Sequence, residues 1–247
     1  MNVIEASGLG KRYGHTWALR ECTLEIPAGQ VAALVGPNGA GKTTLLNLTV
    51  GLTPPSAGAV TVLGGRRAGS PAALDAIAFV AQDTPLYKTL SVADMIYVTR
   101  SLNRRFDQPY AKARLDELGI PQKRKSGRLS GGQQAQLALT LALARRPQLL
   151  VLDEPVAALD PVARHDFMAT VLAAASADGV SVLLSSHVLT ELERVTSYLV
   201  LMSRGRVQLA GEVGDLLAAH GQASLEELAM TYLRASGERG TTPEVTR

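Results

Sequence analysis

A glycine-rich segment between an apolar run and a helical pattern constrains the fold of this chain most. Residues 36–44 read Gly-Pro-Asn-Gly-Ala-Gly-Lys-Thr-Thr, and the apolar run Val31–Val35 precedes them. Lys42–Val50 then has helical spacing and stops at Gly51. Glycines let backbone N–H groups wrap a phosphate, and the helix directs the positive end of its dipole toward it. We therefore expect a strand, a phosphate-cradling loop and a helix, in that order.

The residues of this loop have separate expected roles. Lys42 reaches the β- and γ-phosphates of a nucleotide, and the hydroxyl of Thr43 binds Mg²⁺. The expected phosphate-binding set also contains Gly36, Pro37, Asn38, Gly39, Ala40, Gly41 and Thr44. A glycine-rich turn without a ligand is the alternative. Because glycine makes up about 7% of an average sequence, a chance match to the pattern is on the order of one in a hundred.

Two adjacent carboxylates follow a second apolar run. Asp153 and Glu154 come directly after Leu149–Leu152, which is typical of a short buried strand. An Asp at this point can hold Mg²⁺ through the water shell of the ion, and the adjacent Glu can polarise an attacking water. The pair could instead be exposed loop residues, but beside a phosphate-binding loop we expect nucleotide chemistry.

Strand and helix patterns alternate along the chain, which predicts an α/β fold with a largely parallel sheet. Val180–Leu184 is a third continuous apolar run, and Ser185-Ser186-His187 follows it. Polar residues after buried strands agree with the rule that α/β sheets bind ligands at the carboxyl ends of their strands. Hydrophobic residues make up 46% of the chain and charged residues 19%, which is typical of a soluble globular protein.

Two parts of the chain depart from this alternation. The first thirty residues and Ala59–Gly64 are short β-rich pieces separated by Gly and Pro, and we expect a small antiparallel sheet there. Ser91–Leu102, Pro109–Leu118 and Gly131–Arg145 carry apolar residues at helical spacing. A helical insertion is therefore expected to interrupt the main sheet.

The segment Leu129-Ser130-Gly131-Gly132-Gln133 opens the third of these helices. Ser130 suits the N-cap, and the glycine pair exposes N–H groups at the helix start, a second anion site without a second nucleotide loop. A purely structural cap is the alternative, although glycine would then weaken the helix without any gain. With this segment between the phosphate loop and Asp153-Glu154, the chain resembles the ATP-binding subunits of ABC transporters over nearly its whole length.

The resemblance implies an α/β fold of the ABC ATPase type, which is a P-loop NTPase with a RecA-like core, a small antiparallel β subdomain and a helical insertion. It implies a single ATPase domain over residues 1–234. The expected parts are a nucleotide-binding core at 1–82 and 147–215, a helical signature subdomain at 83–146, and a C-terminal helical segment at 215–234. Residues 235–247 are expected to form a disordered tail.

The resemblance also implies roles for single residues. Tyr13 would stack on adenine, Gln82 would touch Mg²⁺ and water, and His187 would contact the γ-phosphate. Subunits of this family form head-to-tail dimers, in which Asp160 would belong to a segment that crosses the interface and would be one of the residues of the ATP site. The implied cofactors are ATP and Mg²⁺, with Thr43, Gln82 and Asp153 as metal ligands, Lys42, Gln82, Glu154 and His187 as catalytic residues, and Ser130, Gly131, Gly132 and Gln133 completing the ATP site of a second subunit. Taken alone, Tyr13 and His187 would be packing or surface residues.

Three positions depart from the family pattern. Gln136 and Leu141 stand where arginine is common, and Ala157 replaces the usual small hydroxyl residue before Asp160. These departures bear on contacts across a dimer interface and on the rate of hydrolysis, and leave the class of activity unchanged.

The implied partners are a separate transmembrane permease and a second ATPase chain, in a homodimer or a heterodimer, and no direct contact with nucleic acid is expected. Pro85–Val98 is the expected docking surface, with Leu86 and Tyr87 central; ordinary loop residues are the alternative. No stretch approaches the roughly 18–20 apolar residues of a membrane span, and no signal peptide is apparent. We expect a cytoplasmic protein, held at the inner face of the membrane by the permease.

The sequence also bears on the direction of transport and on alternative functions. Ser101–Asp107 and the short tail resemble bacterial exporters. An ABC ATPase acting on nucleic acid or ribosomes is the alternative, but such relatives typically carry two cassettes or coiled-coil insertions. A P-loop GTPase would need an Asn-Lys-x-Asp motif, which is absent. The net charge of +3 is too small to indicate a nucleic-acid surface, and the basic run Lys123-Arg124-Lys125 near Arg128 is expected to be a solvated loop.

Overall fold

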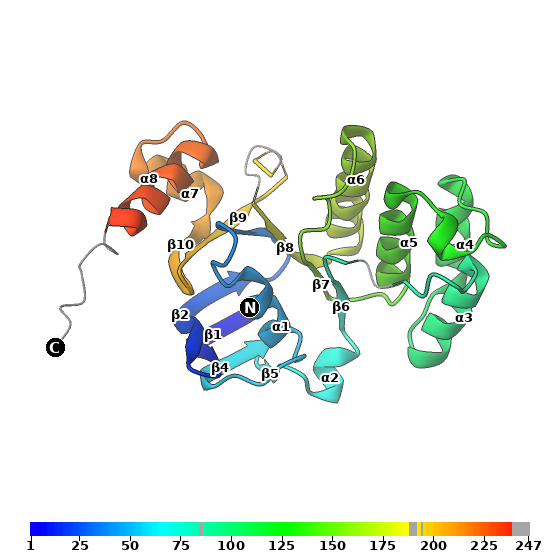
Figure 1. The fold of residues 1–247 in the computed structure, drawn as a ribbon, viewed down its shortest axis with the longest axis horizontal. Helices are drawn as coiled ribbons and strands as arrows, with labels where there is room; N and C mark the ends of the chain where they lie inside the picture. The colour runs from blue at the N-terminus through cyan, green and yellow to red at the C-terminus, as the bar shows by residue number, and fades with distance from the viewer. Residues whose placement is uncertain (84–85, 188–191, 194, 239–247) are drawn as a thin grey trace.

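Two β-sheets and a separate group of helices make up the chain, as Figure 1 shows. The structure is a computed structural model and describes residues 1–83, 86–187, 192–193 and 195–238. The larger sheet carries the phosphate loop, and the smaller sheet lies beside it. Helices α3 (Val92–Leu102) and α4 (Gln108–Glu117) lie at the opposite edge of the molecule from α7 (Val213–His220) and α8 (Leu225–Glu238). The predicted α/β class, with an antiparallel part and a helical insertion, is confirmed.

The larger sheet has six strands in the order β10-β9-β3-β8-β7-β6. Strand β3 pairs in parallel with β8 and β9, and β7 pairs in parallel with β6 and β8. The edge strand β10 runs antiparallel to β9. The strands are β3 (Val31–Val35), β6 (Ile77–Val80), β7 (Leu149–Leu152), β8 (Ser181–Ser186), β9 (Tyr198–Ser203) and β10 (Arg206–Glu212). Strand β8 begins and ends later than the predicted run 180–184, because its two terminal serines continue the pairing with β3.

Both faces of the central strands of this sheet are buried, which explains why β3 and β7 are continuously apolar, whereas the edge strand β10 is partly exposed. In β3, Ala32 and Leu34 belong to one hydrophobic core, and Val31, Ala33 and Val35 belong to the other. The first core also contains side chains of the antiparallel sheet and of α1 (Lys42–Thr49). The second contains side chains of α6 (Pro161–Asp178), α7 (Val213–His220) and α8 (Leu225–Glu238).

The smaller sheet is antiparallel, as predicted, with the strand order β2-β1-β4-β5. Its strands are β1 (Asn2–Tyr13), β2 (Thr16–Pro27), β4 (Ala57–Val62) and β5 (Arg66–Arg67), and the short helix α2 (Pro71–Leu74) follows it. The β1–β2 register is irregular at several places, among them between Ala6 and Leu9, and such irregularities bend long strands locally.

The predicted helical insertion consists of α3 (Val92–Leu102), α4 (Gln108–Glu117), the short 3-10 helix η1 (Ser126–Arg128) and α5 (Gly131–Leu143). Ser91 caps α3 and Asp107 caps α4, so each helix begins within a residue or two of the predicted start. The insertion has its own core, which includes Ile96, Leu115 and Leu137.

The C-terminal part is more helical than expected. Helix α7 starts at Val213, and α8 continues to Glu238, beyond the boundary expected at residue 234. Buried Leu225, Leu228 and Ala229 hold α8 against the second core, which explains why the helix forms there. The rest of the expected tail, residues 239–247, lies outside the described residues.

Candidate functional site

The loop at residues 36–44 connects β3 to α1 and is shaped by two glycines. A Cβ on Gly36 would lie 2.3 Å from the carbonyl oxygen of Met202, so no larger residue fits against β9. Gly41, at the N-cap of α1, has φ 100°, a conformation that side chains rarely adopt. The N-terminal end of α1, with its free N–H groups, therefore opens onto the loop, as an anion site requires.

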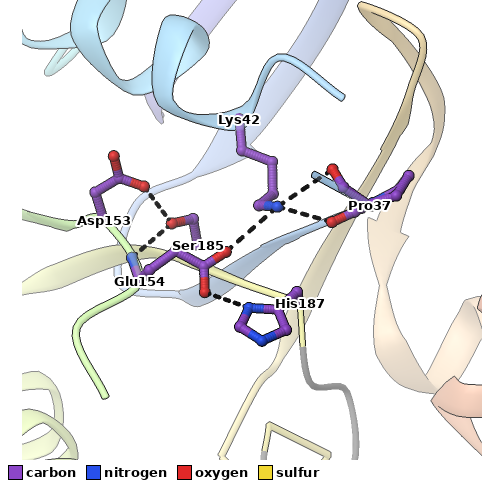
Figure 2. A network of polar contacts seen from close by, with 7 residues as sticks. Pro37, Lys42, Asp153, Glu154, Ser185 and His187 are labelled. Atoms are coloured by element: carbon purple, nitrogen blue, oxygen red, sulfur yellow. Dashed lines mark hydrogen bonds and ion pairs between the residues drawn. The ribbon is translucent and has the colours of Figure 1, made fainter. Parts of the chain in front are cut away.

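Lys42 lies at the first position of α1 and points back across the loop (Figure 2). Its ammonium group donates to the carbonyl oxygen of Gly36 at 2.7 Å and to that of Pro37 at 3.4 Å, and it lies 3.3 Å from a carboxylate oxygen of Glu154. The Lys42 and Glu154 side chains are only 7% and 9% exposed. A buried lysine on a phosphate-binding loop is a positive charge for which a phosphate oxygen can replace the present partners.

Asp153 and Glu154 follow β7 and are organised by Ser185, the fifth residue of the neighbouring strand β8 (Figure 2). The Ser185 hydroxyl donates to Asp153 at 2.6 Å and accepts the backbone N–H of Glu154 at 2.8 Å. Glu154 has φ 47°, a strained conformation for a residue with a side chain, at a cost on the order of 1 kcal/mol. Ser185 therefore ties the two acidic residues to the sheet at the point where the chain turns sharply.

Ser185 was not among the predicted site residues. Its position in the polar run after β8 was the available signal, but a serine there is consistent with a simple strand end. Only the parallel register, which places Leu152 opposite Leu184, brings Ser185 beside Asp153 and Glu154.

His187 follows β8 directly and contacts the same glutamate. Its Nδ1 lies 2.7 Å from the second carboxylate oxygen of Glu154, and its side chain is 48% exposed. Glu154 therefore lies between a lysine on one side and a histidine on the other, as Figure 2 shows. Such a carboxylate can accept a proton from a water that lies beside it, and the histidine can hold its orientation.

Lys42, Glu154 and His187 share one open cavity of about 450 Å³, whose lining does not include Gly36, Pro37 or Asp153. The predicted residues Tyr13 and Gln82, distant in sequence, line it together with Asn38–Thr44, Glu154 and His187. Tyr13 is 50% exposed, with the ammonium group of Lys11 5.2 Å from its ring centre, so one ring face is available for stacking. Ala18, which the sequence did not single out, also lines the cavity.

The oxygen donors in and beside this cavity suit Mg²⁺. Thr43 is exposed at the start of α1 and Gln82 lines the cavity, while Asp153 is buried and holds Ser185 through one carboxylate oxygen, which leaves the other free. Mg²⁺ takes few protein ligands and keeps waters and phosphate oxygens, so a sparse oxygen set fits it. Within the described residues, no group of three or more His, Cys, Asp or Glu side chains could hold a metal by itself.

The segment Ser130–Gln133 does not line this cavity in the part of the chain that the structure describes. Ser130 caps α5 and exchanges hydrogen bonds with Gln133, each 3.2 Å long. A Cβ on Gly132 would lie 2.9 Å from Ala163 of α6, whereas a Cβ on Gly131 would meet no atom within 4 Å. Asp160 is likewise outside the cavity lining and caps α6 through the N–H groups of Val162 and Ala163. The glycine pair thus combines internal packing with an exposed face.

The three departures from the family pattern have different surroundings. Leu141 packs in the core of the helical insertion, where an arginine side chain would bury its charge. Gln136 is 6% exposed, and neither atom of its amide has a hydrogen-bond partner among the described residues. Ala157 is exposed. Leu141 therefore has a clear structural reason, while nothing in the structure explains Gln136.

The chain matches one protein family and several of its characterised members. The model of the family described as ABC transporter matches residues 19–157. The chain is 31% identical to the lantibiotic transport ATP-binding protein SrtF of Streptococcus pyogenes, over 92% of this chain and 95% of the relative. It is 34% identical to the Nod factor export ATP-binding protein I of Cupriavidus pinatubonensis, over 87% and 68%. It is also 34% identical to the Fe(3+) ions import ATP-binding protein FbpC of Mesorhizobium japonicum, over 87% and 62%.

Solved structures give the same result. An ATP binding subunit of an ABC transporter superposes with a TM-score of 0.83 at 27% identity, covering 93% of this chain and 99% of the other. A bacterial ABC transporter cassette, solved in dimeric form, superposes with a TM-score of 0.75 at 25% identity, covering 85% and 98%. A search of the described helices finds none that is long and apolar enough to cross a membrane.

Proposed function

Because the chain belongs to the ABC transporter family, whose ATP-binding subunits couple ATP hydrolysis to transport, we propose that it powers an exporter by forming an ATP-dependent head-to-tail dimer. The activity class is ATP hydrolysis. The observation that supports the proposal best is the pairing of Glu154 with Lys42 of the phosphate loop and with His187, within one cavity.

ATP would occupy this cavity with its triphosphate along the loop. The adenine would stack on Tyr13, and the N–H groups of Gly36–Thr44 would surround the phosphates. Thr43, Gln82 and Asp153 would hold Mg²⁺, which would offset the charge of the phosphate oxygens.

The ion pair of Lys42 with Glu154 has a direct consequence for this mechanism. A phosphate that takes the Lys42 ammonium group releases Glu154 from its buried counter-charge. The free carboxylate would then orient a water for attack on the γ-phosphate, and His187, whose Nδ1 lies 2.7 Å from Glu154, would contact the same phosphate. Binding of the nucleotide would thus convert a neutralised pair into a base.

The second half of the site would come from another chain. Ser130–Gln133 lies outside the cavity of its own chain, and Gly131 has open space around it. In a head-to-tail dimer, the N–H groups at the start of α5 would face the γ-phosphate bound by the partner. Asp160, at the exposed N-cap of α6, would lie near the same interface. The dimeric form of the related cassette supports this arrangement.

A separate permease would receive the motion, and its docking surface would be Pro85–Val98. Tyr87 is 65% exposed there and Leu86 is partly buried against the core of the insertion. Pro85 lies outside the described residues. Docking would hold the ATPase at the cytoplasmic face of the membrane, with no direct contact with nucleic acid.

Export is supported by two relatives. The protein matched over 95% of its length is a lantibiotic transport protein, and a Nod factor export protein is 34% identical. Relatives named for import of Fe(3+) ions reach similar identity, and the chain spans only 62% of the length of the one from Mesorhizobium japonicum.

The test of the proposed function is the change Glu154→Gln. The amide keeps the shape of the side chain but cannot accept a proton, so ATP should bind while turnover falls by about 100-fold or more. The variant should then accumulate as an ATP-dependent dimer in size-exclusion chromatography. Hydrolysis at the wild-type rate would disprove the role of Glu154, and the absence of any ATP-dependent dimer would disprove the two-chain site.

A further inference from the structure

The positive charge of this protein is concentrated in the helical insertion. Residues 83–146 contain 12 Lys and Arg residues and 5 Asp and Glu residues, a net charge of +7. The rest of the chain contains 13 and 17, a net charge of −4, so the overall value of +3 conceals a strong asymmetry. Figure 1 shows α3 and α4 of the insertion at one edge of the molecule.

Five of these basic residues gather at the start of α3. Backbone hydrogen bonds join the segment before α3 to η1: Ser126 N–H donates to the carbonyl of Leu90 at 2.9 Å, and Gly127 N–H donates to that of Lys88 at 3.1 Å. Val92 N–H donates to the carbonyl of Arg124 at 3.0 Å. We call the resulting surface the basic face; it comprises Lys88, Lys123, Arg124, Lys125 and Arg128.

The basic face has no internal counter-charge. All five side chains are exposed, and within the described part of the chain none forms an ion pair or a side-chain hydrogen bond. Asp94, Asp116 and Glu117 are the acidic residues within the adjoining helices α3 and α4, and Glu117 pairs with Arg114 at 3.1 Å. Asp94 is bound by Ser91 at 2.6 Å, and Asp116 accepts from Gln122 at 3.3 Å. Hydrogen bonds between the two segments hold the five unpaired basic residues in one region, which suits the binding of an anionic ligand.

Exposed aromatic and aliphatic side chains accompany this charge. Tyr87, whose carbonyl accepts the hydroxyl of buried Ser126, is 65% exposed. Tyr97, in the middle of α3, is 69% exposed. At the far end of the helix from the basic face, Leu102 is 79% exposed, and the exposed residues Arg104 and Arg105 follow it. Exposed tyrosine and leucine beside basic residues are typical of surfaces that lie against lipid headgroups. The permease proposed to dock at the neighbouring Leu86 and Tyr87 would bring lipid to the basic face, which favours lipid over nucleic acid.

We propose that the basic face binds the anionic phospholipid headgroups of the membrane. This inference rests on the proposed function, because docking through Leu86 and Tyr87 places Lys88 and its neighbours next to the membrane surface. Attraction to an anionic leaflet acts within about a Debye length, roughly 8–10 Å at physiological salt. Lipid contact would orient the ATPase toward its permease and stabilise the docked state.

The experiment measures cosedimentation of the full chain with vesicles. One set contains phosphatidylcholine alone, and the other contains phosphatidylcholine and phosphatidylglycerol in equal parts. The wild type should bind the anionic set, less so at high salt, and should leave the neutral set unbound. The variant Arg124→Glu/Lys125→Glu should lose binding by at least about tenfold, since each basic residue near an anionic surface contributes appreciably.

The matched control is Arg66→Glu/Arg67→Glu, which makes the same change in net charge on exposed β5 in the antiparallel sheet. It should retain binding to the anionic vesicles. Equal loss in both variants would overturn the proposal in favour of net charge alone. So would equal binding of the wild type to both vesicle sets, or release of the wild type from vesicles by an equal mass of duplex DNA.

ATP hydrolysis in vesicle-free buffer separates this inference from the proposed function. Lost vesicle binding with unchanged hydrolysis by the Arg124→Glu/Lys125→Glu variant supports the lipid contact. Lack of hydrolysis by the wild type would contradict the proposed function, whatever the vesicles show. If the charge reversal prevents folding, Lys88→Gln/Lys123→Gln replaces it, and retained binding by that variant overturns the proposal.

Discussion

At the scale of the residue, the site depends on a few short contacts between strand ends. Glu154 is contacted by Lys42 and His187, and Ser185 joins its backbone to the Asp153 carboxylate. Because the Glu154 backbone is strained, its side chain needs such support to remain directed into the cavity. Ser185 therefore acts as a positioning residue.

The change Ser185→Ala tests this role. It removes the donor to Asp153 and the acceptor for the Glu154 N–H, so kcat should fall about 10–100-fold while the KM for ATP changes little. Ser185→Thr, which keeps a hydroxyl, should restore part of the rate. The control is Ser203→Ala at the end of β9, a buried serine whose hydroxyl bonds to no described residue. An equal loss of kcat in the control would show a general packing effect instead.

At the scale of the element, the start of α4 is held to the chain that leads into β7. Asp107 caps α4 through the N–H of Tyr110 at 2.9 Å and pairs with Arg146 at 2.7 Å. The Arg146 guanidinium also lies 4.7 Å from the ring centre of Tyr110. The hydrogen bond from the Tyr110 N–H, and to a smaller extent the bond from the Arg146 guanidinium, hold the pKa of Asp107 below its usual range. Arg146 also lies 3.6 Å from the carboxylate of Asp178 in α6, so this guanidinium joins the helical insertion to the nucleotide-binding core.

The pH dependence of stability follows from that pKa. Asp107 binds its proton more weakly in the folded protein than in the unfolded chain. The Asp107–Arg146 pair therefore makes its full contribution to the stability of the folded protein above about pH 4. Its contribution is lost as the pH falls through the lower folded pKa. The change Asp107→Asn, which keeps the cap, should lower the free energy of unfolding at pH 7 by no more than about 1 kcal/mol, since the pair is partly exposed.

Urea denaturation at pH 7 and at about pH 3 measures this difference, which should shrink at the acidic value. Asp83→Asn provides the control, because Asp83 is exposed and its carboxylate has no side-chain or backbone partner in the described ranges. A difference between Asp107→Asn and wild type that stays constant with pH would show that the ion pair contributes nothing.

At the scale of the whole molecule, the chain holds two half-sites that face different surroundings. The cavity at the phosphate loop contains Lys42 and Glu154, while the exposed start of α5 lies outside it. Mixing two inactive variants tests whether these halves meet between chains. Lys42→Ala damages the first half, and Gly131→Leu damages the second by adding a side chain at the exposed start of α5, where a Cβ would meet no atom within 4 Å.

Each variant alone should be inactive in an ATPase assay. A mixed dimer carries both defects in one site and leaves the other site intact, so an equal mixture should recover up to about a quarter of the wild-type rate, if the chains pair at random. Crosslinking would measure the mixed dimers. Their presence without recovered hydrolysis would contradict a site shared between two chains.

The phosphate loop, the buried strands and the helical insertion were predictable from local pattern. Gly36–Thr44 carries its own backbone requirements, and continuous apolar runs such as Leu149–Leu152 indicate strands covered on both faces. The start of α8 and its length were less predictable, because buried contacts of Leu225 and Leu228 with the second core stabilise that helix.

Sequence alone determined the class of chemistry, since Lys42 and the adjacent Asp153-Glu154 suit phosphoryl transfer in any arrangement that brings them together. The tertiary structure decided which partner each charge has. Parallel pairing of β7 with β8 places Ser185 beside Asp153, and the turn after β7 directs Glu154 toward Lys42 and His187. The same holds for the basic face, where the run Lys123-Arg124-Lys125 becomes one surface with Lys88 only through the hydrogen bonds between their segments. Such contacts join residues distant in the chain, and only folding sets the distance between them.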